Sequence, residues 1–170
     1  MRLAPVALFF LLDRRTADFV AREQSRLTHG APQAIEACSF FLQVLQDAVL
    51  GHKDALSPRS WAGDPAIKAI AGGAYQTKTR SQISSSGYVV DTLEAALWSI
   101  SQTTNFEAAV TLGVNLAGDA DTVGAVTGQL AGAIYGVRDI PGRWLDSLAW
   151  QERLQNTATA LLSVPQSLFR

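Results

Sequence analysis

Apolar residues recur every three or four positions along most of the chain, and this spacing constrains the fold more than any other feature. Such spacing places apolar side chains on one face of a helix. In segment 33–50 the residues that share this face are Ile35, Cys38, Phe41, Leu42 and Leu45. No segment of useful length alternates apolar and polar residues as a half-buried strand does. We therefore expect an all-α fold, with residues 1–170 in one domain.

Local signals place the helix boundaries. We expect helices over 3–12, 17–27, 33–50, 66–71, 88–103, 106–118 and 121–136, followed by amphipathic turns beyond Pro141. Thr16 and Asn105 have side-chain oxygens suited to an N-cap, and Gly136 is suited to a C-cap. Segment 77–87 carries no helical periodicity, so we expect it to be exposed and irregular.

Composition excludes several classes of protein. The net charge is −1 and Lys and Arg do not cluster, which argues against a nucleic-acid partner. Cys38 is the only cysteine, so the chain has no internal disulfide framework and no cysteine-built zinc site, and we expect a buried thiol. The apolar run 3–12 is too short to span a bilayer, and no small-residue cleavage site follows it directly. We expect no membrane association.

Segment 115–136 carries glycines at every fourth position behind a polar start. Inside a helix, Gly124, Gly128 and Gly132 together cost about 2–3 kcal/mol relative to alanine. Residues four apart lie on one helix face, so a strip without side chains lets a neighbouring helix or a ligand approach the backbone. We therefore expect segment 121–136 to be a central, tightly packed helix.

The same segment begins with Asp119, Asp121 and Thr122. Carboxylates at a helix start are favoured by the helix dipole, and capping alone would explain one of them. Two carboxylates and a hydroxyl within four residues also offer several hard oxygens, which are the ligands that Mg²⁺, Mn²⁺ and Ca²⁺ prefer. Spacing alone leaves both interpretations open.

Four segments resemble the ADP-ribosylglycohydrolase family and keep its order along the chain. They are "MRLAPVALFF", "LTHGAP", "SSGYVVDTLEAALWSISQTTNFEAAV" and "NLAGDADTVGAVTGQLAGAIYGVRDIPGRW". The resemblance implies a compact all-α orthogonal helix bundle and an activity that hydrolyses the glycosidic bond between ADP-ribose and an acceptor. It also implies an internal core helix at the apolar N-terminal run, and hence a cytoplasmic protein.

The resemblance assigns roles to residues of this chain. Asp119, Asp121 and Thr122 match metal ligands for Mg²⁺ or Mn²⁺, two ions of which are typical of the family. The residues that match positions near bound ADP-ribose are Met1, Arg2, His29, Gly87, Tyr88 and Val89. Two plainer interpretations stay open: His29 at a helix end interacting with backbone carbonyls, and Tyr88 as a core aromatic.

The chain also departs from the family. The family's second metal cluster, an upstream Thr-Asp-Asp segment, has no counterpart here, so half of the ligand set is present and the bundle is expected to be truncated at its N-terminus. No catalytic acid or base is assigned. Three hypotheses follow: a hydrolase shortened in this form, a non-catalytic remnant that binds ADP-ribose or a protein, and a purely structural helical domain. We also expect self-association through the apolar face of residues 3–12.

Overall fold

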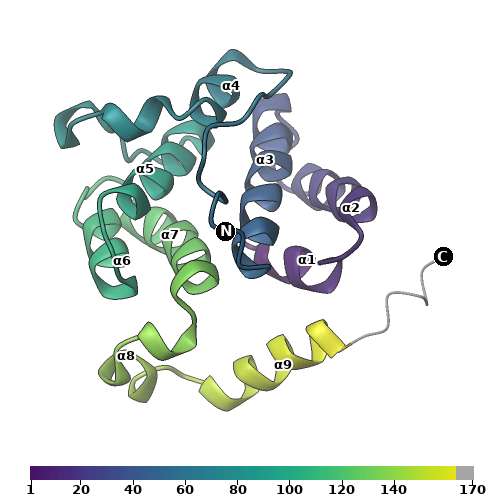
Figure 1. Ribbon diagram of the computed structural model, residues 1–170, viewed down its shortest axis with the longest axis vertical. Helices are drawn as coiled ribbons and strands as arrows, with labels where there is room; N and C mark the ends of the chain where they lie inside the picture. The colour runs from purple at the N-terminus through teal and green to yellow at the C-terminus, as the bar shows by residue number, and fades with distance from the viewer. Residues whose placement is uncertain (164–170) are drawn as a thin grey trace.

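The computed structural model describes residues 1–163, and this part of the chain contains helices and no strand (Figure 1). The α-helices are α1 (Ala4–Phe9), α2 (Arg14–Arg26), α3 (Pro32–Val49), α4 (Pro65–Ala71), α5 (Val89–Ser101), α6 (Phe106–Val114), α7 (Ala120–Tyr135), α8 (Gly142–Asp146) and α9 (Gln151–Ser163). The predicted all-α class is confirmed, and most helix boundaries differ from the prediction by only a few residues.

Helices α3 and α7 form the centre of the molecule. Helix α7 packs against α3, α5 and α6, while α3 also packs against α1, α2 and α4. The side chains that α7 buries are Val123, Val126, Thr127, Leu130 and Ala131. Figure 1 shows α1 and α2 on one side of α3, and α5, α6 and α7 on the other. The expectation that α7 is a central helix is confirmed.

Two of the three predicted caps are correct. Asn105 accepts a hydrogen bond from the Ala108 N–H at 2.8 Å, and Gly136 ends α7 with a φ of 79°, in the left-handed region. The prediction for Thr16 was wrong. Asp13 is the N-cap of α2, and its carboxylate accepts from the Thr16 N–H at 3.1 Å. Aspartate and threonine are both good caps, so sequence preference alone did not separate them.

The glycine stripe of α7 does not serve as a continuous packing surface. A Cβ at Gly124 would lie 2.8 Å from Val114, so α6 approaches the backbone closely there. A Cβ at Gly128 would meet nothing within 4 Å, and one at Gly132 would reach only the Phe106 ring at 4.0 Å. The expected close approach of a neighbouring helix is confirmed at Gly124 alone among these three glycines, and the packed face of α7 is formed mainly by its larger side chains.

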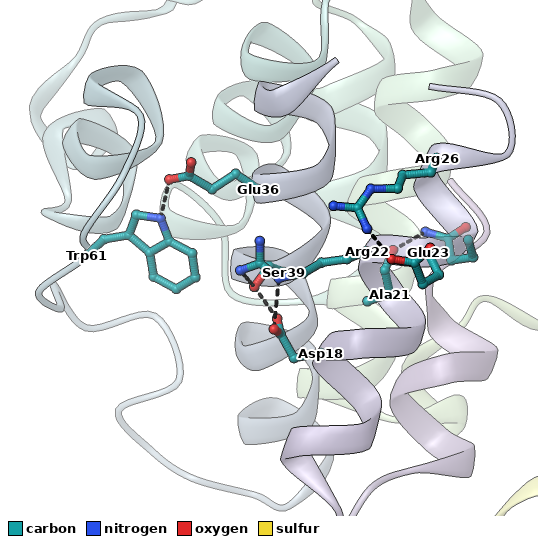
Figure 2. Close-up of polar contacts among 9 residues, drawn as sticks. Asp18, Ala21, Arg22, Glu23, Arg26, Glu36, Ser39 and Trp61 are labelled. Atoms are coloured by element: carbon teal, nitrogen blue, oxygen red, sulfur yellow. Dashed lines mark hydrogen bonds and ion pairs between the residues drawn. The ribbon is translucent and has the colours of Figure 1, made fainter. Parts of the chain in front are cut away.

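A polar clamp joins α2 to α3 (Figure 2). Asp18 accepts from Arg22 Nε at 2.8 Å and from the Ser39 hydroxyl, and Arg22 Nη2 donates to Ser39 Oγ at 2.8 Å. Ser39 is buried, so these bonds satisfy its hydroxyl inside the interface. The neighbouring Cys38 is half-buried rather than fully buried, and Gln24 Nε2 lies 3.6 Å from its sulfur.

Segment 77–87 is more ordered than its sequence indicates. Two short 3₁₀ turns, Ala74–Thr77 and Arg80–Gln82, precede α5, and Ile83 is buried. The segment lies against the loop before α7 through bonds described below.

Near the C-terminal end of the described residues, α9 contacts α1 and buries none of its side chains. None of the helices over residues 1–163 has the length and hydropathy needed to span a bilayer.

Candidate functional site

Asp119 and Asp121 lie side by side at the start of α7. Asp119 occupies the N-cap position, but its carboxylate makes no capping hydrogen bond. A side-chain hydrogen bond with Asp119, followed by backbone N–H groups of Asp121 and Thr122, holds the pKa of Asp121 below its usual value. Capping therefore accounts for the carboxylate of Asp121 better than for that of Asp119. The two carboxylates and the half-buried Thr122 offer a compact group of oxygen donors.

The loop before α5 reaches these carboxylates. A Cβ at Gly87 would lie only 2.8 Å from Asp119 Oδ2, so the Gly87 backbone is in direct contact with the carboxylate. The Asp119 N–H donates to the carbonyl oxygen of Ser85 at 2.7 Å. The structure thus brings together two predicted groups that lie about thirty residues apart in the sequence.

Asp91, in the first turn of α5, shapes this loop. Its Oδ2 accepts hydrogen bonds from the hydroxyls of Ser84 and Ser86, each at 2.6 Å. The Ser86 hydroxyl also accepts from the Tyr88 N–H at 3.1 Å. Asp91 thus orders the serines on both sides of Ser85 through its carboxylate.

Tyr88 is half-exposed, so the interpretation as a core aromatic was wrong. Its hydroxyl donates to Gln33 Oε1 in the first turn of α3. Gln33 Nε2 donates in turn to Asp64 Oδ2 at 2.8 Å, and this bond is the largest cause of a pKa of Asp64 below its usual value. Gln33 was not identified from the sequence, because its partner Tyr88 lies 55 positions away.

Glu36, one turn further along α3, fixes the loop that carries Asp64. Its carboxylate accepts from Trp61 Nε1 at 2.6 Å, as Figure 2 shows, and from the Asp64 N–H at 2.8 and 3.0 Å. The Trp61 ring packs edge-on against Phe40 at 5.3 Å between ring centroids. Trp61 therefore packs against the core and also makes a polar contact that orients the loop.

The N-terminal candidates form a second group. Arg2 donates to the Thr28 hydroxyl at 2.6 Å and to the Gln24 carbonyl oxygen at 3.0 Å. The exposed His29 contacts the Thr28 hydroxyl through Nδ1 at 2.9 Å. The His29 backbone N–H donates to the Ser25 carbonyl oxygen in the last turn of α2 at 2.7 Å, so the plainer interpretation, an interaction with helix-end carbonyls, holds for the backbone of His29. Met1 is exposed beside Arg2.

The two groups meet at the start of α3. His29 lies just before this helix, and Gln33 in its first turn holds Tyr88. Val89 is the first residue of α5, directly after Tyr88. Arg2, Thr28 and His29 therefore form one set of contacts, and Gln33 with Tyr88 forms another, which continues into the loop that touches Asp119. No direct contact joins His29 to Asp119.

The donor set suits a hard divalent cation. A cation bound between Asp119 and Asp121 would stabilise these two neighbouring carboxylates at the start of the helix. Their oxygen atoms are also the type of donor that Mg²⁺ and Mn²⁺ prefer. Across residues 1–163 no three His, Cys, Asp or Glu side chains come together as a metal-binding group. The expected cluster accordingly contributes two carboxylates and one hydroxyl.

Comparison with known proteins identifies relatives of the whole chain. The sequence model of the ADP-ribosylglycohydrolase family matches residues 1–168. The ADP-ribosylarginine hydrolase Tri1 of Pseudomonas putida is 42% identical over 163 residues, which cover 95% of this chain and 44% of that protein. The ADP-ribosyl-[dinitrogen reductase] glycohydrolase of Rhodospirillum rubrum is 30% identical over 171 residues, covering 96% of this chain and 55% of that protein.

A solved structure gives the same result for the fold. A chain of an ADP-ribosylglycohydrolase-related protein complex superposes with a TM-score of 0.78 at 37% identity, covering 91% of this chain and 56% of that one. The chain thus spans about half the length of the relatives it matches. The family model and the superposed structure each match most of this chain. The chain belongs to the ADP-ribosylglycohydrolase family.

Proposed function

We propose that this chain acts as part of an ADP-ribosylglycohydrolase, which hydrolyses the glycosidic bond between ADP-ribose and an acceptor. The observation that carries the proposal is the contact between Asp119 and the Gly87–Tyr88 loop. It places a pair of carboxylates suited to Mg²⁺ or Mn²⁺ against the loop that the family resemblance assigns to ADP-ribose. Asp119, Asp121 and Thr122 would hold the cation.

The side chains of this chain have separate tasks in that reaction. Gly87 leaves room for the Asp119 carboxylate, and the half-exposed Tyr88 ring offers an aromatic surface that Gln33 orients. His29 and Arg2 extend the polar surface on the far side of the α3 start. A divalent cation, when bound, supplies positive charge that polarises the substrate at the bond to be broken.

Hydrolysis adds water to the anomeric carbon of the ribose and releases the acceptor. Its proton transfers need a positioned acid or base. Asp119 and Asp121 are assigned to binding and not to proton transfer, because both face the proposed cation. The catalytic acid or base remains unassigned in this chain.

We propose ADP-ribosylated arginine as the substrate class. The two Tri1 relatives, from Pseudomonas putida and Serratia proteamaculans, are named ADP-ribosylarginine hydrolases and are 42% and 43% identical to this chain. The relative named for dinitrogen reductase is 30% identical. A cytoplasmic location is part of the same proposal, and the absence of a cysteine pair is compatible with a reducing compartment.

Release of ADP-ribose from an ADP-ribosylarginine peptide tests the proposal. The assay compares this chain alone with this chain joined to the amino-terminal part of the Pseudomonas putida relative, each with Mn²⁺ and with a chelator. We expect Mn²⁺-dependent release by the joined protein, and its loss with Asp119→Ala but not with Asp146→Ala, which changes an exposed residue outside the site. An inert joined protein that is folded and supplied with Mn²⁺ would contradict the proposal.

A second candidate function is ADP-ribose binding without turnover. It is favoured by the two-carboxylate donor set over residues 1–163 and by the half-length match to the relatives. Calorimetry with ADP-ribose, with and without Mn²⁺, distinguishes it from the first candidate. Heat of binding together with no product would support the binding function, whereas no heat would exclude it.

A further inference from the structure

Ser85 lies between the two loops of the proposed site and bonds to one of them three times. Its hydroxyl accepts from the Gly118 N–H at 3.1 Å and donates to the Leu116 carbonyl oxygen at 3.2 Å. Its own carbonyl oxygen accepts from the Asp119 N–H at 2.7 Å. One residue of the loop before α5 therefore fixes three successive parts of the loop that carries Asp119.

The packing at this junction leaves little freedom. A Cβ at Gly118 would lie 2.2 Å from the Ser85 carbonyl oxygen, so the two backbones are in contact there. Arg80 adds a further bond across the junction by donating to the Asn115 carbonyl oxygen. A shift of Ser85 cannot leave Gly118 and Asp119 in place, because the contact is made by backbone atoms rather than by flexible side chains.

Ser85 is itself held by the residues on either side of it. Ser84 and Ser86 both bond to Asp91, and Ser86 accepts from the Tyr88 N–H. The position of Ser85 is therefore tied to the start of α5 and to Tyr88. The hydroxyl of Ser85 is the side-chain group that connects this ordered loop, through hydrogen bonds, with the loop before α7.

We infer that Ser85 is a positioning residue that fixes the Asp119 carboxylate for cation binding and links it to the Tyr88 loop. The part of this inference that concerns the cation rests on the proposed function. The part that concerns the loop rests on the hydrogen bonds of Ser85 alone. Because linkage is reciprocal, a cation at Asp119 should change the affinity for a ligand at Tyr88 by the same factor as that ligand changes the affinity for the cation.

Two measurements on the purified chain test the inference. The first is amide hydrogen exchange by NMR without any cation, and the second is the Mn²⁺ dissociation constant from the electron paramagnetic resonance of free Mn²⁺. The variants are Ser85→Ala, which removes the hydroxyl, and Ser85→Thr, which restores one. Ser101→Ala is the matched control, because its hydroxyl bonds only at the far end of α5, to the Trp98 carbonyl oxygen and to Gln102.

We expect Ser85→Ala to speed exchange of the Gly118 amide and to weaken Mn²⁺ binding, each by roughly twofold or more, because the hydroxyl makes two hydrogen bonds and the loss of one neutral hydrogen bond is worth roughly twofold to tenfold. Ser85→Thr should restore much of both, and Ser101→Ala should leave both at the wild-type value. Wild-type exchange or wild-type Mn²⁺ affinity in Ser85→Ala would overturn the positioning role.

A wild-type chain that takes up no Mn²⁺ would count against the proposed cation site. Amide exchange would then decide the inference by itself. Faster exchange at Gly118 in Ser85→Ala would support Ser85 as the link between the loops, and unchanged exchange would overturn it.

Discussion

At the scale of single residues, the proposed site depends on what is absent at Gly87. Its Cα lies against Asp119 Oδ2, and any side chain would have to displace that carboxylate. The plainer role of Asp119 as a cap is not seen, since its side chain makes no capping bond. The Asp119 carboxylate instead lies against the backbone of Gly87.

Gly87→Ala should displace the Asp119 carboxylate, because the new Cβ would lie 2.8 Å from Oδ2. We expect Mn²⁺ affinity to fall by roughly tenfold, equivalent to about 1.4 kcal/mol. Mn²⁺ titration followed by calorimetry measures this. Gly128→Ala, which meets nothing within 4 Å, is the control and should keep wild-type affinity. Equal affinities for the two variants would contradict the role given to Gly87.

Asp47 provides a pH-dependent prediction away from the site. Burial alone would raise the pKa of Asp47, but hydrogen bonds and charges from Arg14 and Arg59 outweigh it and hold the pKa below its usual value. The ion pairs therefore stabilise the fold above the unfolded-state pKa of about 3.9. This stabilisation is lost as the pH falls through the still lower folded-state pKa.

Asp47→Asn should lower the free energy of unfolding at pH 7 by roughly 1–3 kcal/mol, because two arginines lose their anionic partner. Urea unfolding at pH 7 and at steps below pH 4 measures the difference. The difference should shrink in the acid range, where the wild-type carboxyl becomes protonated. Asp54→Asn, at an exposed position, should differ little from wild type at either pH. A pH-independent loss would show that the charge of Asp47 is not the cause.

At the scale of elements, α7 shows which properties of a helix can be predicted from local sequence and which cannot. Its end at Gly136 follows from C-capping, which is a local property, whereas its central place was expected from the strip of glycines. The face that packs does not follow from the glycines. Gly124 is crossed by α6, whereas Gly128 faces open space, and only the arrangement of neighbouring helices decides between them.

Substitution at these two glycines should therefore have opposite effects on stability. Gly128→Ala should raise the free energy of unfolding by about 0.5–1 kcal/mol, because alanine favours the helix and meets no neighbour. Gly124→Ala should lower it, since the new Cβ would lie 2.8 Å from the Val114 side chain. Urea unfolding of both variants measures the signs. Equal signs would contradict the packing described for α7.

At the scale of the whole molecule, the helix bundle and the pair of carboxylates were predictable, but the site was not. Periodicity predicted the helices, and the "GDADT" segment indicated the carboxylates that are proposed as cation ligands. The bonds that assemble the rest join residues far apart, such as Tyr88 with Gln33 and Ser85 with Gly118. No local pattern marks such pairs. The serines of segment 77–87 therefore suggested only an irregular loop.

Self-association also belongs to this scale. The apolar segment 3–12 is partly covered, since Leu3 and Ala7 are buried, but Leu12 remains 76% exposed. A groove of about 230 Å³ lies beside α1, lined by Ala4, Leu8 and residues of α3 and α7. We predict concentration-dependent association through this face, because exposed apolar patches favour partners.

Sedimentation velocity over a range of concentrations tests this prediction. Leu12→Asp should shift the chain towards monomer, while Leu27→Asp, at an exposed position on the C-terminal side of α2, should leave the distribution unchanged. A wild-type chain that stays monomeric throughout would remove the prediction.

Asp119, Asp121 and Thr122 are proposed to hold a divalent cation beside the Gly87–Tyr88 loop. Anomalous diffraction from crystals of this chain soaked in Mn²⁺ tests this arrangement. We expect an anomalous peak within about 2.0–2.3 Å of oxygens from Asp119 and Asp121, the bonding distance of a small hard cation. A well-ordered map with no peak there, and with the two carboxylates pointing apart, would contradict it.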